Sequence, residues 1–234
     1  MTTPKSSDMS FMAHFEELRR RLLVSVVVLV ITTLISFTFS THLLKLLAMP
    51  IGGLDKLQSI EVTESVSVYM RVSLLSGVVF AMPVIVYELL RFILPALKPK
   101  EKKWVIIAVP AATLLFAGGI VFTYYIMLPP AIQFLTTFLD IQTAPRLKNY
   151  MDFVLNLLFW VGISFESPLL IYVLAKLHIV NGKMLLKQWR VAIVIITIAA
   201  AVITPTVDPI NMGILMVPLF GLYILSVILA FLAR

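Results

Sequence analysis

Long stretches without a charged residue constrain this chain more than any other feature of its sequence. Residues 22–44 and 104–139 contain no Asp, Glu, Lys or Arg. A helix rises about 1.5 Å per residue, so about 20 apolar residues can cross the hydrocarbon core of a bilayer. Hydrophobic residues occupy 60% of the 234 positions and charged residues only 13%, against about 45–50% and about 25% in soluble domains. The sequence therefore predicts an all-α polytopic membrane protein.

The apolar segments predict six spans within a single domain that covers residues 1–234. The expected spans are residues 22–41, 66–92, 104–128, 153–175, 191–204 and 210–233. Pro129 and Pro130 are expected to end the third span, because proline lacks the backbone donor that a helix interior uses. The fifth span has only 14 residues before Pro205, so it is short for a full crossing. Gly118 and Gly119 are expected at a close contact between helices.

The Lys and Arg residues in the loops and near the ends of the spans predict the orientation. If the N-terminus is cytoplasmic, fourteen of these residues fall on the cytoplasmic side and five on the external side. Short cytoplasmic loops usually carry more Lys and Arg than external loops, so both termini are predicted to be cytoplasmic. This placement also accounts for the net charge of +7 without a nucleic-acid partner.

Residues suited to catalysis or metal binding are scarce. The chain has three histidines and no cysteine, and it contains no HExxH, GxSxG or phosphate-binding glycine motif. We therefore predict no metal site, no cofactor and no enzymatic activity.

The N-terminal segment is predicted to form an amphipathic helix that lies along the inner surface and runs into the first span. Apolar residues recur at helical spacing at Phe11, Phe15, Leu18 and Leu22. Glu16–Arg20 and Glu17–Arg21 are pairs of opposite charge four residues apart, which favours a helix. The segment is either a plain interfacial anchor or a surface whose carboxylates face a partner.

The first cytoplasmic loop contains one acid among several lysines. Glu101 lies between Lys100 and Lys102, where it either relieves lysine repulsion or binds a cationic partner. Phe92 and Pro95 mark the end of the second span. Phe92 is also consistent with an ordinary aromatic residue packed at the membrane interface.

Glu166 is the most informative polar residue, because a carboxylate inside a membrane is costly and usually functional. Together with Ser164 and Ser167 it predicts a polar patch, kinked by Pro168. A neighbouring helix could satisfy this carboxyl. Alternatively, Glu166 could be the protonatable site of a small proton-coupled secondary transporter.

Two external segments also carry acids. Asp208 precedes a proline in a tight external turn, which is ordinary turn chemistry. Glu61 and Glu64 are expected to be solvated in the first external loop.

Six short segments, in the right order and topology, resemble the TatC family, the multispanning subunit of the twin-arginine protein translocase. The segment His14-Phe-Glu-Glu-Leu-Arg-Arg-Arg is similar to the family's His-Leu-x-Glu-Leu-Arg-x-Arg, and Phe165-Glu-Ser-Pro is similar to Phe-Glu-x-Pro. The other four segments begin at Ala81, Phe92, Lys100 and Thr204. The resemblance runs from about residue 11 to residue 231.

The resemblance implies a receptor that binds Arg-Arg signal peptides at its cytoplasmic face and organises proton-motive-force-driven export of folded proteins. The residues implied in peptide binding are Glu101, Glu17, Phe92 and Arg19. The resemblance also gives loop roles to Pro50, Pro83, Pro95 and Asp208, and it places Glu166 at a polar cavity. The implied partners are single-span TatA and TatB subunits, lipid and further copies of the chain, in the cytoplasmic membrane of a prokaryote.

Overall fold

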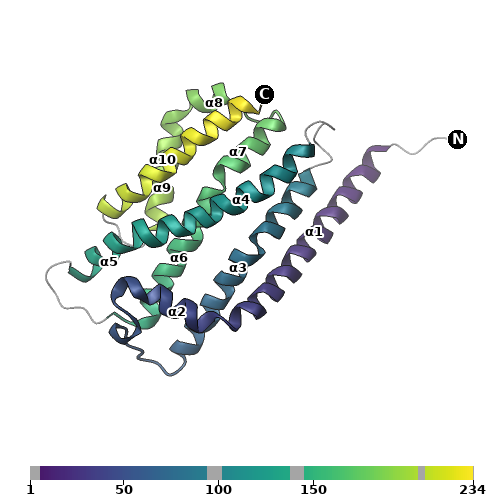
Figure 1. Cartoon of the computed structure of the whole chain (residues 1–234). Coiled ribbons are helices and arrows are strands. Elements are labelled where there is room, and N and C mark those ends of the chain that lie inside the picture. The colour runs from purple at the N-terminus through teal and green to yellow at the C-terminus, as the bar shows by residue number, and fades with distance from the viewer. Residues whose placement is uncertain (1–5, 94–101, 138–144, 205–208, 234) are drawn as a thin grey trace.

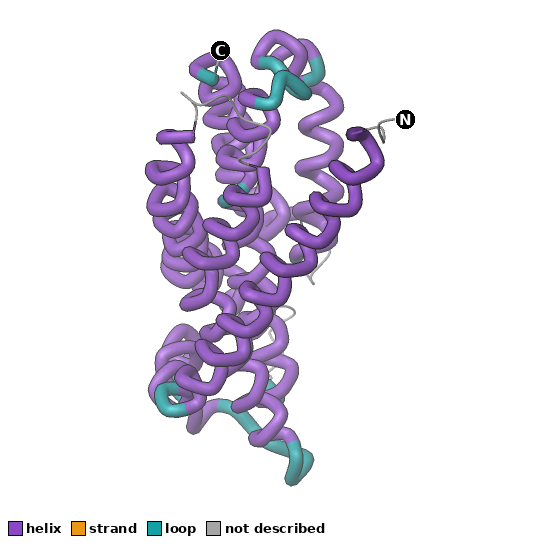
Figure 2. Tube along the Cα trace, turned by 90° about the vertical axis from the view of Figure 1, so that its right-hand side faces the viewer, coloured by secondary structure: helices purple, strands orange, loops and turns teal. Residues whose placement is uncertain are grey.

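The computed structural model of the protein is a bundle of helices (Figure 1). The structure describes residues 6–93, 102–137, 145–204 and 209–233. The regular elements in those ranges are helices, with one isolated β-bridge between Gln58 and Arg146. The first turns of α1 (Ser6–Phe37) and the last turns of α10 (Pro209–Leu232) lie at the same end of the bundle in both views (Figures 1 and 2). We call this the inner end, and the opposite end the outer end. The all-helical class predicted from the sequence is confirmed.

Five helical segments are long and apolar enough to cross a membrane. They are Phe15–Phe37, Glu64–Phe92, Ala108–Thr137, Leu147–Lys176 and Asn211–Leu232. The elements that contain the middle three are α3 (Glu64–Ile93), α4 (Lys102–Phe122) with its continuation, and α6 (Leu147–Phe165) with α7 (Ser167–Lys176). These segments overlap five of the six expected spans, but the first ends at Phe37 instead of residue 41 and the third runs on to Thr137.

The expected fifth span corresponds to α9 (Trp189–Ile203), which has 15 residues and is therefore about 22 Å long. It does not continue back into α8 (Gly182–Lys187), because the helix is interrupted at Gln188. A crossing of the membrane by α9 remains a prediction.

The N-terminal amphipathic segment is not a separate helix. It forms the first turns of α1, which continues without a break to Phe37, so the charged residues 16–21 and the apolar residues that follow share one axis. The charged turns of α1 are thereby placed beside the inner end of its neighbour α3.

The expected end of the third span at Pro129 and Pro130 is wrong. A π-helical turn, η4 (Thr123–Met127), follows α4, and α5 (Leu128–Thr137) follows η4 directly. Both prolines therefore fall in the first turn of α5, where a helix needs no backbone donor. The wider turn of a π-helix lets the chain continue past them.

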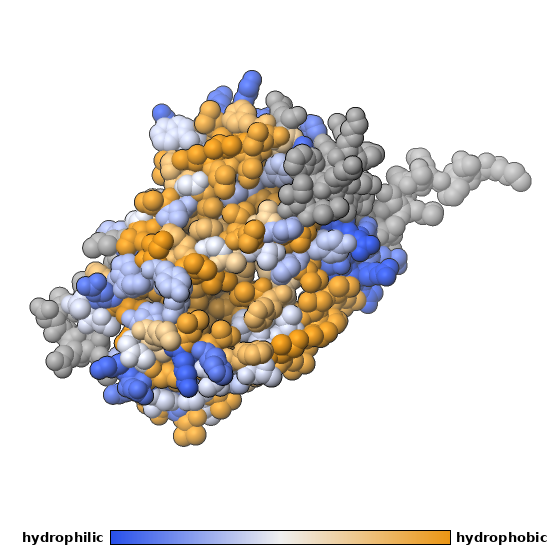
Figure 3. Space-filling view, viewed as in Figure 1, coloured by the Kyte–Doolittle hydropathy of each residue, from blue (hydrophilic) through white to orange (hydrophobic). Residues whose placement is uncertain are grey.

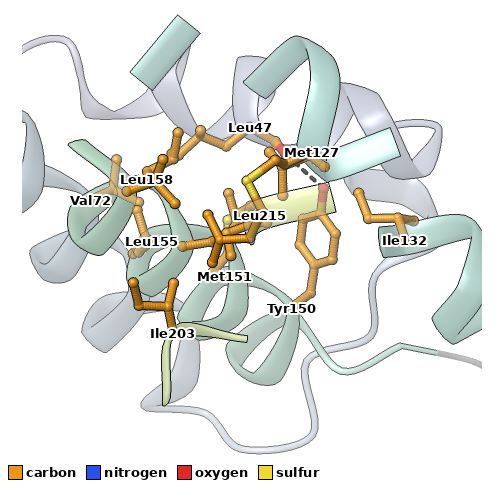
Figure 4. Close-up of a cluster of buried hydrophobic side chains, with 14 of the residues drawn as sticks. Leu47, Val72, Met127, Ile132, Tyr150, Met151, Leu155, Leu158, Ile203 and Leu215 are labelled. Atoms are coloured by element: carbon orange, nitrogen blue, oxygen red, sulfur yellow. Dashed lines mark hydrogen bonds between the residues drawn. The ribbon is translucent and has the colours of Figure 1, made fainter. Parts of the chain in front are cut away.

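The main hydrophobic core lies towards the outer end and joins residues of seven elements, and Figure 4 shows part of it. Met151 from α6 and Leu215 from α10 are fully buried at its centre. Leu47 comes from α2 (Ser40–Ala48), and its carbonyl accepts a 2.8 Å hydrogen bond from the Tyr150 hydroxyl, drawn as a dashed line. The core thus fixes α2, the first outer element, against α6.

A close helix crossing attaches α1 to α3. A Cβ added to Gly77 would lie 2.2 Å from Thr33 Oγ1 and 2.7 Å from Thr33 Cα. The Thr32 hydroxyl donates to the Gly77 carbonyl at 2.8 Å, and Ser40 bonds Ser73 one turn further out. Only 6% of the most apolar window of α1 is buried, so this crossing carries most of its attachment.

A second close crossing joins α4 to α6. A Cβ on Gly119 would lie 2.9 Å from the ring of Phe165 and 3.1 Å from Gly162 Cα, whereas a Cβ on Gly118 would meet nothing within 4 Å. The prediction of close packing is therefore confirmed for Gly119 and wrong for Gly118.

Glu64 organises the outer loops, and the expectation that it is solvated is wrong. Its side chain is completely buried, and it accepts hydrogen bonds from four donors. They are the backbone amides of Ile60 at 3.0 Å, Glu61 at 3.3 Å and Lys148 at 2.6 Å, and Arg146 Nε at 3.1 Å. Glu61 is more than half exposed and pairs with Arg146 at 2.7 Å. Together with the β-bridge at Gln58, these contacts tie the loop after α2 to the start of α6.

The exterior of the bundle between its two ends is mostly apolar, as a lipid environment requires. Apolar side chains cover the middle of the face seen in Figure 3, and the most hydrophilic side chains gather towards the two ends. Many large apolar side chains on α1, α9 and α10 are more than half exposed, including Leu34, Val202 and Leu232. An apolar belt between polar ends is what a bilayer requires of a spanning protein.

Candidate functional site

At the inner end, α1 and α3 bring three charged side chains together. Arg21 on α1 forms an ion pair with Glu17 one turn earlier on the same helix. Its Nη1 also donates to Glu88 Oε2 on α3 at 3.3 Å. Arg21 and Glu88 expose only 14% and 12% of their side chains, and Glu17 exposes 33%. We call this arrangement the Arg21 bridge, because one guanidinium joins carboxylates from two helices.

The Arg21 bridge forms one wall of a cavity of about 480 Å³. The cavity is lined by Glu16, Glu17, Arg20, Arg21, Val24, Glu88 and Arg91. Three of these residues are acidic and three basic, so the cavity can hold a cationic ligand only if the ligand competes with, or adds to, the arginines already there. Arg21 Nε is buried and has no hydrogen-bond partner among the described residues.

The residues expected to bind a signal peptide are placed only in part. Glu17 lies in the cavity wall. Phe92 is half-buried in the last turn of α3, and Arg19 is exposed on α1. Glu101 and Pro95 lie outside the described residues, in the connection between α3 and α4. The structure thus brings the helices that carry Glu17 and Phe92 together, and the place of Glu101 remains a prediction.

Sequence reasoning identified the Glu17–Arg21 pair but missed Glu88. Glu88 was visible only as an acid near the end of an apolar segment. The pairing of Glu88 with Arg21 was predictable, because the two residues carry opposite charges at the inner ends of two consecutive spans. Consecutive antiparallel helices place such residues at similar depth.

Glu166 lies in a break between two helices, as the neighbouring Pro168 predicts. The first helix, α6, ends at Phe165, and α7 begins at Ser167 with Pro168 in its first turn. The Oε1 atom of Glu166 is buried and has no hydrogen-bond partner among the described residues. The alternative that a neighbouring helix satisfies this carboxyl is therefore not supported by that part of the chain.

A second cavity, of about 330 Å³, lies beside this break, between α7, α9 and α10. Ser164 and Ser167 line it, together with Gln188, Tyr223 and Ser226 at its polar positions. The rest of its lining is apolar, so it fits a mostly apolar helix better than a hydrated ion. Glu166 itself is not part of this lining.

Two of the remaining predicted residues, both prolines, lie in helices. Pro50 lies in the short helix η1 (Met49–Ile51), and Pro83 lies inside α3. Asp208 lies outside the described residues. Within the described ranges, no group of three or more His, Cys, Asp or Glu residues is placed to hold a metal ion.

Known proteins resemble this chain over nearly its whole length. The family model described as "Sec-independent protein translocase protein (TatC)" matches residues 13–218. The protein of that name from Deinococcus radiodurans is 36% identical over 236 residues, which cover 97% of this chain and 87% of the relative. The one from Carboxydothermus hydrogenoformans is 33% identical over 225 residues, which cover 95% and 93%.

Two crystal structures of a "Twin Arginine Translocase Receptor- TatC" have the same fold. One gives a TM-score of 0.81 at 35% identity and covers 94% of this chain and 99% of its own. The other, determined in DDM, gives 0.83 at 32% identity and covers 93% and 99%.

Proposed function

The chain belongs to the TatC family, and from that premise we propose that it is the receptor subunit of a twin-arginine translocase, which binds Arg-Arg signal peptides at the inner end of its bundle. As a member of this family it is a multi-pass membrane protein and a component of the protein translocase rather than a classical enzyme. Beyond family membership, we propose the ligand, the end of the bundle that binds it and the residues that contact it.

The observation that carries the proposal is the cavity between the inner ends of α1 and α3, with Glu17 and Glu88 in its wall. A guanidinium is a planar fork of donors that matches a carboxylate at two points, which the ammonium of lysine cannot reproduce. Each charge-assisted hydrogen bond contributes roughly 1.5–3 kcal/mol where water is limited, and less where the groups are exposed. Two such contacts, at Glu17 and Glu101, would favour an arginine pair over a lysine pair by about 100-fold.

The proposed orientation places both termini and this cavity in the cytoplasm, in the cytoplasmic membrane of a prokaryote. The support is the excess of Lys and Arg in the segments at the inner end. The energy source that we propose for export is the proton-motive force.

Single-span TatA and TatB subunits are the partners that we propose, with further copies of this chain in a larger complex. The cavity beside Ser164 and Ser167 supports a docking place for a partner helix, because its lining is apolar with a few hydroxyl and amide groups. Such groups hold transmembrane helices together when the partner offers a complementary polar side chain.

Peptide binding to the purified full-length protein in lipid nanodiscs tests the receptor function. A labelled peptide with the Arg-Arg pair is expected to bind about 100-fold more tightly than the same peptide with Lys-Lys. Glu17→Ala and Glu101→Ala are each expected to weaken binding of the Arg-Arg peptide by about tenfold. Asp55→Asn, an exposed carboxylate of the outer loop, is the control. Equal binding of both peptides to the unaltered protein would refute the receptor function.

The alternative function, a small proton-coupled secondary transporter, is not favoured. It rested on Glu166 as a protonatable site, and the family that matches residues 13–218 is a protein translocase. The buried, unpaired Oε1 of Glu166 is compatible with a carboxyl that hydrogen-bonds a partner helix or a signal peptide.

A further inference from the structure

In the Arg21 bridge, Arg21 and an arginine of the signal peptide would compete for the same carboxylate, Glu17. Glu17, proposed to meet an arginine of the signal peptide, is already paired with an arginine of this chain. An incoming guanidinium must therefore take Glu17 from Arg21 or share it. The bridge has a second carboxylate, Glu88, on the neighbouring helix, and Arg21 already contacts it.

We propose that Arg21 is an internal competitor for the signal peptide and that Glu88 is the residue that holds Arg21 when the peptide takes Glu17. The inference rests on the proposed receptor function and assigns roles to two residues that need not touch the peptide. Glu88 is a positioning residue, because it acts on peptide binding through Arg21.

The exposure of the three side chains favours this division of roles. Glu17 exposes 33% of its side chain, whereas Glu88 exposes 12%. A peptide that approaches from the surface therefore meets Glu17 before Glu88. Arg21 exposes only 14% of its side chain, and an arginine left there without any carboxylate would be a poorly solvated, unpaired charge. Glu88 removes that penalty, because Arg21 stays paired after it gives up Glu17.

The hydrogen bonding of Arg21 shows that its present arrangement can be improved on. Its Nη1 reaches Glu88 Oε2 at 3.3 Å, which is long for a charge-assisted bond of about 2.7–2.9 Å. Its Nε has no partner among the described residues. One guanidinium thus divides its donors between two carboxylates. Once Glu17 is occupied by the peptide, the fork of Arg21 can turn to Glu88 alone and bind it at two points.

This exchange lets Arg21 act as a filter. A ligand with a single cation gains only the contact to Glu17 when it displaces Arg21. A ligand with two guanidiniums gains a second carboxylate contact elsewhere on the inner surface, so it can offset the displacement. The competitor thereby raises the discrimination between signal peptides and other basic peptides, at some loss of absolute affinity.

A double-mutant cycle on peptide affinity tests the inference, in full-length protein in nanodiscs with the Arg-Arg peptide as probe. Glu88→Gln is expected to weaken binding by about tenfold, because Arg21 then has only Glu17 as a partner. Arg21→Gln is expected to tighten binding by up to about tenfold, because the competitor is gone. The double variant Arg21→Gln/Glu88→Gln is expected to bind like Arg21→Gln, because Glu88 has nothing left to hold.

Three results would overturn the inference. Weaker binding by Arg21→Gln would show that Arg21 positions Glu17 for the peptide instead of competing for it. A double variant as weak as Glu88→Gln would show that Glu88 contacts the peptide directly or is needed for folding. Unchanged binding by Glu88→Gln would show that Arg21 does not restrict the site.

The same measurements separate this inference from the receptor function. If the unaltered protein prefers the Arg-Arg peptide over the Lys-Lys peptide and Glu88→Gln has no effect, the receptor function stands and the inference fails. If the unaltered protein shows no preference, both fail. Asp55→Asn, which removes one negative charge at the outer loop, is the control for net charge and is expected to bind like the unaltered protein.

Discussion

Gly77→Ala is expected to loosen α1 from the bundle, because the α1–α3 crossing has no room for a methyl group. The added Cβ would lie 2.2 Å from Thr33 Oγ1, 2.7 Å from Thr33 Cα and 2.9 Å from Thr33 N. Ordinary contacts begin at 3.4 Å. Two of these three neighbours are backbone atoms, so a side-chain rotation cannot clear the space. The two helices must separate by about 1 Å.

The separation has two costs. Forcing an extra carbon into a packed interface typically costs about 1–3 kcal/mol. The hydrogen bond from the Thr32 hydroxyl to the Gly77 carbonyl, now 2.8 Å, would also be lost, although the hydroxyl keeps the carbonyl of Val28 at 2.9 Å. A hydrogen bond between membrane helices contributes about 0.6 kcal/mol on average. The helix preference of alanine over glycine offsets up to about 1 kcal/mol of these costs, so the free energy of unfolding is expected to fall by about 1–3 kcal/mol.

The thermal midpoint of the purified protein in one detergent is a direct assay, with Gly118→Ala as the matched control. Gly118 is also a glycine within an apolar helix, but its added Cβ would meet nothing within 4 Å. It is expected to be neutral or slightly stabilising, because alanine favours helix over glycine by up to about 1 kcal/mol. Gly77→Ala is expected to lower Tm by roughly 3–10 °C.

Thr33 gives a further test of the same geometry. Its hydroxyl is buried without a hydrogen-bond partner among the described residues, so Thr33→Ala alone is expected to be nearly neutral. Combined with Gly77→Ala it is expected to restore only part of the lost stability, because the backbone atoms of Thr33 remain too close. Equal Tm values for Gly77→Ala and Gly118→Ala would refute the reasoning, and so would full rescue by Thr33→Ala.

Three other sites give predictions that can be measured separately. Glu166→Gln is expected to retain more export of a folded cargo than Glu166→Leu, because the amide keeps hydrogen-bonding capacity; equal losses would point to the charge or the proton. Glu64→Gln is expected to make the outer loops sensitive to added protease and to lower Tm, because an amide cannot accept all four hydrogen bonds, whereas the exposed Glu61→Gln is expected to do neither. Single cysteines placed from Met184 to Asp208 are expected to show a stretch of about 15 residues protected from water-soluble thiol reagents, the length of α9; a protected stretch of about 20 residues would contradict the short helix.

Local sequence determined the limits of two long helices closely. The second span, expected at residues 66–92, is α3 (Glu64–Ile93), and the sixth, expected at 210–233, is α10 (Pro209–Leu232). The break at Glu166 was also predicted, from the adjacent Pro168. These features follow from terms that depend on a residue and its chain neighbours: the transfer of side chains into an apolar medium and the backbone donor that proline lacks.

Only the tertiary structure decided which polar groups are paired. Glu64 is buried because residues 60–61, in the loop before α3, and residues 146–148, at the start of α6, converge on it. Arg21 is shared between Glu17 and Glu88 because α1 packs on α3 at the depth that Gly77 sets. The prolines of the third span continue the helix because η4 precedes them. Each outcome depends on the register between segments distant in sequence or on a backbone choice made in the folded bundle, and apolar content along the chain carries no information about that register.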